Sequence, residues 1–355
     1  VELPHWRRQL VQLDLGQFEA VLQAPVVEAA GDGTSPALRE EPAPYIVATP
    51  EARVQPPDGA AATTRAVLAT ADLSRGTLAT LSNRLGYNEE IVARWLRALE
   101  RKGQAIFTGP PGVGKTFAAR LLARYLADDS DGFWELVQFH AAYSYEDFIQ
   151  GLRPKANAAG QLDYTVEPGH FLDFCRRAAQ RRGRCVLVID EINRANVARV
   201  FGELLYLLEY REDAIRLAGG QAPFRIPANV RLIGTLNSAD RSIALFDFAL
   251  RRRFAFIELA PNPNQLRLLP PQQRPFSIEA LIKLVERVNK AIDDPAFAVG
   301  YTYFLRTDLT DSLPEIWESE IEPYLAEYFF NQPDRVAEFR WSQVCADFEA
   351  ATTTE

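Results

Sequence analysis

The segment from residue 109 to residue 116 constrains the fold of this chain more than any other feature. It fits the pattern G-x-x-x-x-G-K-[ST], and its residues are Gly109, Pro110, Pro111, Gly112, Val113, Gly114, Lys115 and Thr116. An apolar run at residues 105–108 precedes it and a helical pattern follows it, which is the setting of a loop that cradles phosphates. Backbone N–H groups and the helix N-terminus would surround the phosphates, Lys115 would neutralise their charge, and the Thr116 hydroxyl would bind Mg²⁺. We therefore predict a nucleoside triphosphate site here rather than an accidental Gly/Pro turn.

Apolar runs similar to the one at residues 105–108 recur along the middle of the chain. They lie at residues 135–140, 185–190, 230–237 and 254–259, and helical patterns separate them at residues 117–127, 170–181 and 197–210. Short apolar strands that alternate with helices are typical of a parallel sheet covered on both faces. Two inserts, at residues 149–167 and 214–226, are expected to be β-hairpins. The predicted fold class is therefore α/β, with a five-stranded parallel core.

The 355 residues are enough to form two compact domains. Residues 24–62 are rich in Ala, Pro and Gly, so residues 1–80 are expected to be an N-terminal linker segment that is partly disordered. Residues 81–260 carry all five apolar runs and should form the nucleotide-binding domain. Helical periodicity returns at residues 278–292 and 316–330, which predicts a helical lid over residues 261–355.

Two carboxylates, Asp190 and Glu191, stand at the end of the apolar run at residues 185–190. Ligands bind at the carboxyl ends of parallel strands, so both are expected near the phosphate loop rather than on an unrelated surface. There Asp190 would hold Mg²⁺ through water, and Glu191 would orient and deprotonate the attacking water. Asn237 ends the next run. An Asn at a strand end is more often a turn former or helix cap, but its place among these motifs favours contact with the γ-phosphate and that water.

Three consecutive arginines, Arg251, Arg252 and Arg253, precede the last apolar run. Such a triplet is usually a solvated surface or a nucleic-acid patch. In a ring-forming nucleoside triphosphatase, however, one such arginine reaches the γ-phosphate of the neighbouring subunit, and we favour Arg252 or Arg253 for that role. The site would then be completed between subunits, so a lone subunit is expected to hydrolyse nucleotide poorly.

Charge and hydropathy exclude two kinds of partner. The formal net charge of -8 argues against a protein that coats nucleic acid by bulk electrostatics, so DNA contact should be local or made by a partner. No apolar run reaches the ~18 residues that a membrane helix needs, and no secretory signal pattern opens the chain. We therefore expect no membrane contact and a cytoplasmic location.

Several longer strings are more specific than the phosphate loop. They are VQFH at residues 137–140, YSYEDF at 143–148, IDEINRAN at 189–196, FGELLYLLE at 201–209, GTLNSADRS at 234–242, ALRRRF at 249–254 and GYTYF at 300–304. Together they resemble the McrB-type AAA+ GTPases, the motor subunits of methylation-dependent restriction systems. The resemblance covers about residues 85–335.

This resemblance implies an AAA+ fold with a helical lid, assembled as a hexameric ring that hydrolyses GTP with Mg²⁺. It implies stimulation by an McrC-like endonuclease subunit and translocation of DNA before cleavage. Because the chain shows no nuclease constellation of its own, cleavage should require that partner. The resemblance also assigns Asn237 to positioning of water, within the motif M-N-T-A-D, and Arg194 to a contact network between protomers.

The chain departs from the family's pattern at several positions. Leu236 and Ser238 replace Met and Thr, Val113 replaces Thr in the phosphate loop, and Tyr301-Thr302 replace a His-Ser pair. The last change leaves the lid's nucleotide contacts open. The first 75 residues are too short and too rich in Pro and Ala for the family's modified-base-reading domain, so methylcytosine recognition does not follow.

Two other functions compete with a GTP-driven restriction motor. An ATP-driven chaperone of the MoxR type would remodel a protein partner without meeting DNA. No N-K-x-D guanine motif occurs, so the preference for GTP over ATP rests on the resemblance alone. A catalytically silent scaffold is disfavoured because Lys115, Thr116, Asp190, Glu191 and Asn237 are all present.

Overall fold

The computed structural model describes residues 76–128, 130–156, 162–220, 222–240, 248–269, 277–306 and 308–352. The linker expected over residues 1–80 therefore lies almost entirely outside the described residues. Helix α3 (Leu78–Leu85) crosses residue 80 and packs on α4 (Glu89–Lys102). Within the ranges given above, no helix combines the length and the apolar character needed to cross a bilayer.

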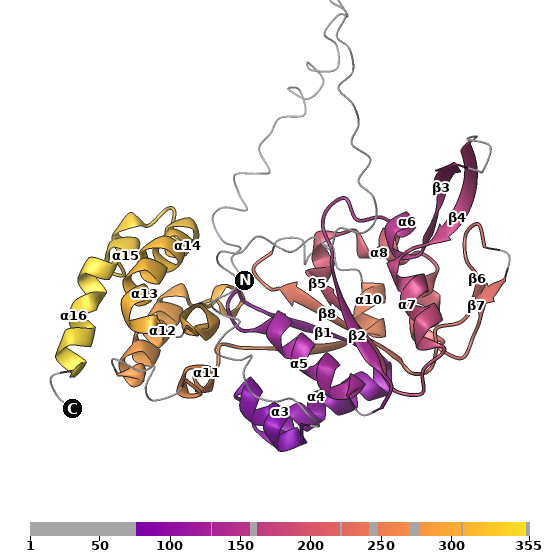
Figure 1. Ribbon diagram of the computed structural model, residues 1–355. Helices are drawn as coiled ribbons and strands as arrows, with labels where there is room; N and C mark the ends of the chain where they lie inside the picture. Colours follow the sequence, from indigo (N-terminus) through magenta and orange to yellow (C-terminus); the bar gives the residue numbers. More distant parts are fainter. Residues whose placement is uncertain are drawn as a thin grey trace, which may run out of the picture. The chain divides into compact units, whose positions relative to one another are not determined.

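Five parallel strands form the central sheet in the order β2-β5-β8-β1-β9 (Figure 1). Their bounds are β1 Gln104–Gly109, β2 Phe133–Gln138, β5 Cys185–Asp190, β8 Val230–Asn237 and β9 Ala255–Glu258. Each coincides, within a residue or two, with one of the five predicted apolar runs. The prediction of an α/β fold around a five-stranded parallel sheet is therefore confirmed.

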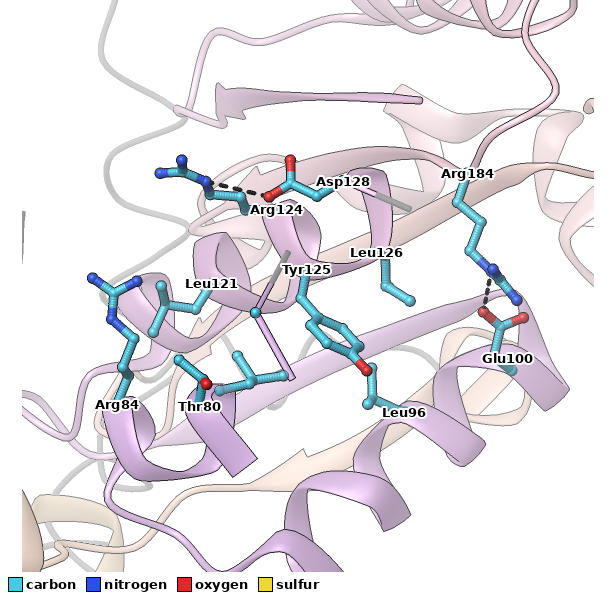
Figure 2. Close-up of a pocket in the computed structure, with 12 residues that line it drawn as sticks. Thr80, Arg84, Leu96, Glu100, Leu121, Arg124, Tyr125, Leu126, Asp128 and Arg184 are labelled. Atoms are coloured by element: carbon cyan, nitrogen blue, oxygen red, sulfur yellow. Dashed lines mark ion pairs between the residues drawn. The ribbon is translucent and has the colours of Figure 1, made fainter. Parts of the chain in front are cut away.

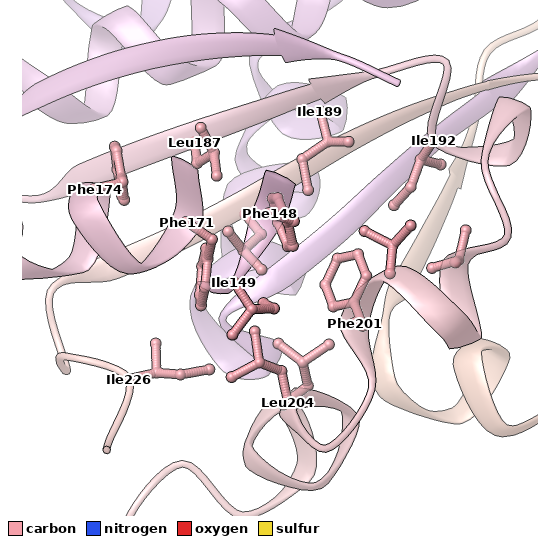
Figure 3. Packing of buried hydrophobic residues seen from close by; sticks show 14 of the residues in the cluster. Phe148, Ile149, Phe171, Phe174, Leu187, Ile189, Ile192, Phe201, Leu204 and Ile226 are labelled. Carbon is pink, nitrogen blue, oxygen red and sulfur yellow. The ribbon is translucent and has the colours of Figure 1, made fainter. Parts of the chain in front are cut away.

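The sheet separates two hydrophobic cores, because successive side chains of a strand point to opposite faces. On β5, Leu187 and Ile189 belong to one core, and Val186 and Val188 belong to the other. Figure 3 shows the first core, in which the stacked rings of Phe148 and Phe171 lie near β5. The helices around the sheet are α5 Lys115–Ala127, α6 Tyr145–Phe148, α7 His170–Ala178, α8 Val197–Phe201, α9 Leu204–Glu209 and α10 Phe248–Arg253. Burial on both faces explains why the central strands are continuously apolar.

The strand register gathers several predicted site residues at the carboxyl edge of the sheet. Asn237 on β8 pairs with Gly109, the first residue of the phosphate loop, and Asp190 on β5 pairs with Gln138. Ile189 pairs with Gly234, so the next residues of β5 and β8 continue side by side toward this edge. The loop, the carboxylates and the asparagine thus meet because their strands are parallel neighbours.

The helix predicted over residues 197–210 is wrong as a single element, because α8 ends at Phe201 and α9 begins at Leu204. Gly202 between them has φ 48 and ψ -128, a conformation that breaks the helical ladder. The break brings the Glu203 carboxylate within reach of two donors, the Tyr145 hydroxyl at 2.7 Å and the Ala218 N–H at 2.7 Å. Helical periodicity in the sequence could not show this tertiary anchoring.

Both predicted hairpins are present as antiparallel strand pairs. The first joins β3 (Gln150–Ala156) to β4 (Leu162–Pro168), and the second joins β6 (Ile215–Arg216) to β7 (Pro223–Phe224). The tip of the first hairpin, residues 157–161, lies outside the described residues.

The residues after the sheet form a helical region with its own core. Its helices are α11 Asn264–Arg267, α12 Ile278–Ile292, α13 Leu309–Ile316, α14 Glu322–Tyr328, α15 Pro333–Ala337 and α16 Trp341–Thr352, with a π-helical segment at Trp317–Ile321. Trp317 is fully buried in this core and donates from its indole nitrogen to the Phe339 carbonyl at 2.7 Å. The predicted helical lid is thereby confirmed.

Candidate functional site

The loop after β1 has the backbone that phosphate binding requires. Gly112 and Gly114 have φ 74 and φ 84, values that side-chain-bearing residues seldom adopt. Gly114 is the N-cap of α5, and no side chain caps this helix, so its first N–H groups are left for an anion. Val113 is fully buried between the two glycines and anchors the loop to the core. The residue that stands where the family has Thr is therefore part of the hydrophobic core.

Lys115 lies under the loop with its ammonium group held by backbone oxygens. Its Nζ donates to the carbonyls of Gly109 at 3.0 Å and Pro110 at 2.7 Å, and the residue is 8% exposed. Burial lowers the pKa of Lys115 to about 8, and the nearby carboxylates, led by Asp190, oppose that shift. A bound phosphate would supply the missing negative charge and favour the protonated amine.

Asp190 joins the phosphate-loop helix to strand β8. Its Oδ1 accepts hydrogen bonds from the Thr116 hydroxyl at 2.7 Å and the Thr235 hydroxyl at 2.6 Å. These oxygens fit Mg²⁺, which binds through one or two protein oxygens together with waters and substrate phosphates. The described ranges hold no cluster of three or more His, Cys, Asp or Glu side chains that would suggest a different metal centre. Sequence reasoning missed Thr235, whose position next to Asp190 follows from strand register.

Glu191 has an unusual backbone and a charged neighbour. It adopts the left-handed conformation, φ 52 and ψ 46, and its N–H donates to the Thr235 hydroxyl at 3.0 Å. Its Oε2 lies 2.7 Å from Nε of Arg194, three residues further along the chain. A non-glycine residue with positive φ is uncommon and marks a position held by its surroundings. Arg194, which the resemblance assigned to contacts between protomers, here pairs with a carboxylate of its own chain, and its contact with a neighbouring protomer stays a prediction.

Asn237 lines the same cavity as the loop and the two carboxylates, and the cavity encloses about 720 Å³. The N–H of Ser238 donates to Gly109 at 2.9 Å, which ties the end of β8 to the loop. Beyond it, Asp240 accepts a hydrogen bond from the Asn193 amide at 3.0 Å. The described structure therefore brings together the predicted loop, Asp190, Glu191 and Asn237.

The helical lid contacts the loop directly. The N–H and the hydroxyl of Thr302 both donate to the Gly112 carbonyl, at 2.9 and 2.8 Å. Gln265 donates to the Val113 carbonyl at 3.2 Å. A Cβ at Gly300 would lie 2.0 Å from Gly112, so only glycine permits this approach. Of the residues that replace the family's His-Ser pair, Tyr301 is buried in the lid and Thr302 holds the loop.

The arginine triplet is not part of this edge. Arg253 lies two residues before the start of β9, which runs parallel to β1, whereas the phosphate loop follows β1. The triplet therefore lies at the opposite, amino edge, about 15–20 Å away at ~3.3 Å per strand residue. There Arg252 and Arg253 both pair with Glu209, and Lys102 donates to the Arg252 carbonyl at 2.8 Å. These arginines cannot reach the phosphate loop of their own chain.

Two family models match the chain. An AAA domain (dynein-related subfamily) matches residues 104–254, and the alpha-helical lid domain of McrB matches residues 280–337. The Type IV methyl-directed restriction enzyme EcoKMcrB subunit of Escherichia coli is 38% identical over an alignment of 276 residues that covers 71% of this chain and 59% of that protein. The Type II restriction enzyme BsuMI component YdiS of Bacillus subtilis is 27% identical over 200 residues, covering 45% of this chain and 57% of its own length. The chain thus spans under three fifths of either relative.

The first family model spans the strands from β1 to β8 and places the chain in the class of AAA+ nucleoside triphosphatases. The second covers most of α12 and continues through α15. The match to the McrB lid domain and the 38% identity to the Escherichia coli protein identify the group within the AAA+ class. The chain belongs to the McrB-type AAA+ family.

Proposed function

We propose that the chain is the motor subunit of a restriction complex and hydrolyses a nucleoside triphosphate, with GTP favoured over ATP. It would act as a homo-oligomeric ring, expected to be a hexamer, together with an McrC-like endonuclease subunit and DNA. The names of the two relatives, both components of restriction enzymes, support the restriction role. The preference for GTP rests on the family resemblance.

One observation carries the proposal: the groups that hydrolysis needs are divided between two edges of one sheet. The carboxyl edge holds the phosphate loop, Asp190, Glu191 and Asn237. The amino edge holds Arg252 and Arg253, too far away to serve the same nucleotide. A head-to-tail contact between identical subunits joins two different surfaces and closes into a ring, which would bring the two edges together.

Each residue at the carboxyl edge has a role that its surroundings support. Loop N–H groups and Lys115 would hold the β- and γ-phosphates, and Thr116 with Asp190 would hold Mg²⁺, which neutralises phosphate charge when bound. Glu191, oriented by its bond to Thr235 and by Arg194, would accept a proton from the attacking water. Asn237 would orient that water.

The arginines would act on a neighbour's nucleotide. Arg252 or Arg253 of one subunit would stabilise the charge that develops on the phosphates bound by the next. In the described chain Glu209 holds both guanidinium groups near the start of β9, so the pair is already positioned at a surface. Arg252 is 69% exposed and Arg253 17% exposed, which makes Arg252 the more accessible of the two.

Hydrolysis measured across protein concentration tests the proposal. The rate per subunit should rise as rings assemble, and kcat/KM should be higher for GTP than for ATP. A rate per subunit that stays constant from monomer to ring would contradict a shared site. A preference for ATP would instead support the chaperone of the MoxR type.

The restriction role needs a separate test with the partner present. The chain would be purified with the products of its neighbouring genes and incubated with DNA and nucleotide. Cleavage that requires a hydrolysable nucleotide and an intact Lys115 would support the proposal. Cleavage that is independent of this chain would contradict it.

A further inference from the structure

The nucleotide cavity continues past the phosphate loop to a wall that it shares with a second cavity. The second cavity encloses about 590 Å³ beside α3, α4 and α5. Three residues line both cavities: Arg84 on α3, and Leu121 and Arg124 on α5. In Figure 2 the guanidinium groups of Arg84 and Arg124 extend to the same side of the view, with Leu121 between α3 and α5.

The distance from the phosphates to this wall suits the remainder of a nucleotide. Lys115 and Arg124 belong to the same helix, and the nine residue steps from one to the other separate their backbone positions by about 13 Å at ~1.5 Å per residue. Along that path the cavity is bordered by apolar side chains, among them Leu121, Leu268 and Leu269. Apolar walls with a few polar groups are typical of small-molecule sites. A base attached to phosphates at Lys115 can therefore lie between the leucines, against the arginines.

The chemistry of this wall distinguishes the two purine bases. A guanidinium group has only donors and no acceptor. Guanine presents two acceptors, O6 and N7, on one edge, whereas adenine presents N7 beside the N6 amino donor. Asp128, whose Oδ2 lies 3.6 Å from Nε of Arg124, lines the second cavity but not the nucleotide cavity. Among the three residues that line both cavities, the polar groups are the two arginines, and their donors pair with O6 but oppose an N6 amino group.

We propose that Arg84 and Arg124 form the base-recognition end of the nucleotide cavity and select guanine over adenine by donating hydrogen bonds to O6 and N7. The inference rests on the proposed nucleoside triphosphatase function. It adds the residues that choose the base, which no motif in the sequence identifies. Asp128, four residues further along the chain, pairs with Arg124, and Leu121 lines both cavities beside the two arginines.

Nucleotide analogues in the full-length chain test which base atoms are recognised. The wild-type protein would be assayed for kcat/KM with GTP, ITP, 7-deaza-GTP and ATP. ITP keeps O6 and N7 and lacks only the 2-amino group, so it should stay within about threefold of GTP. ATP and 7-deaza-GTP, which lack O6 or N7, should fall by roughly 10- to 100-fold, as expected for loss of a bidentate base contact. ITP as poor as ATP would overturn the proposal.

Substitutions then test the two arginines. Arg84→Gln and Arg124→Gln should each lower the GTP-to-ATP ratio of kcat/KM about tenfold, mainly through a higher KM for GTP. Arg97→Gln, an exposed arginine on α4 that lines neither cavity, is the matched control and should leave the ratio unchanged. Binding of fluorescent GDP and ADP supplies a readout that does not depend on hydrolysis.

The outcomes separate this inference from the proposed function. A wild-type ring that hydrolyses no nucleotide would refute the function itself. A wild-type enzyme that is active, with a GTP-to-ATP ratio unaffected by both arginine substitutions in hydrolysis and in binding, would overturn only the base-recognition site. If Arg84→Gln does not fold, Arg124→Gln decides the question, because Arg124 is a half-exposed residue in the last turn of α5.

Discussion

The two edges of the central sheet differ in how far their charged groups are buried and hydrogen-bonded. At the carboxyl edge, Asp190 accepts two hydroxyl bonds and Lys115 is buried against loop carbonyls, so the groups are preorganised around a cavity. At the amino edge, Arg252 is largely exposed and pairs with Glu209 at the surface. The carboxyl edge holds the phosphate loop without an arginine of the triplet, and the amino edge displays that triplet, so the two edges are complementary. The difference supports the proposal that the nucleotide site is completed by a neighbouring subunit.

The largest loss of kcat should come from substitution of the arginines at the exposed amino edge. Replacing Arg252 and Arg253 together by Ala should lower kcat about 10³-fold or more, as expected for loss of an arginine finger, and leave nucleotide affinity nearly unchanged. Arg251→Ala is the matched control, because the Arg251 guanidinium packs on the Phe256 ring. Steady-state hydrolysis and equilibrium binding measure the two effects. Loss of binding together with turnover would place the arginines in the ground-state site instead.

At the buried carboxyl edge, substitution of the proposed base should also lower kcat, but by a smaller factor. Glu191→Gln should lower kcat by ~10² or more and leave nucleotide binding intact, because the amide keeps the shape but cannot accept the proton. Glu203→Gln is the matched control, since Glu203 anchors Tyr145 and Ala218 away from the cavity. Unchanged turnover in Glu191→Gln would refute its role as the base.

The pH dependence of binding should reveal the burial of Lys115. Its pKa in the free protein is lowered to about 8, and a bound phosphate would raise it. Above pH 8 the free amine is neutral, so binding must take up a proton, and affinity should fall toward tenfold per pH unit. Titration of nucleotide binding between pH 7 and 9.5 measures this slope. Lys115→Arg, which stays protonated, should remove it, and an identical slope in this variant would contradict the assignment to Lys115.

The smallest effect should be a loss of nucleotide affinity when a lid residue that holds the phosphate loop is replaced. Thr302→Val removes the hydroxyl bond to Gly112 and keeps the backbone bond, so nucleotide affinity should fall about 3- to 10-fold, the value of one hydrogen bond. Thr302→Ser retains the hydroxyl and should bind like the wild type. Equal affinities for the Val and Ser variants would show that the lid does not preorganise the loop through this bond.

The parts of this account that sequence could predict are those set by local pattern. The apolar runs predicted all five strands, and the motif order predicted which residues stand at the carboxyl edge, because parallel strands align their ends. Contacts across the fold were not predictable. Thr235 and Thr302 act on Asp190 and Gly112 from distant parts of the chain, and Gly202 at the helix break lies against the ring of the distant Tyr145. None of these contacts produces a periodic pattern of apolar residues in the sequence.

A mixing experiment tests the shared site most directly. Subunits carrying Glu191→Gln would be combined with subunits carrying Arg252→Ala and Arg253→Ala, each inactive alone. In a mixed ring, a subunit with an intact Glu191 can receive an arginine from its neighbour, so random assembly should restore about a quarter of wild-type turnover. No recovery from subunits that bind nucleotide and assemble together would contradict a site built from two opposite edges of the sheet.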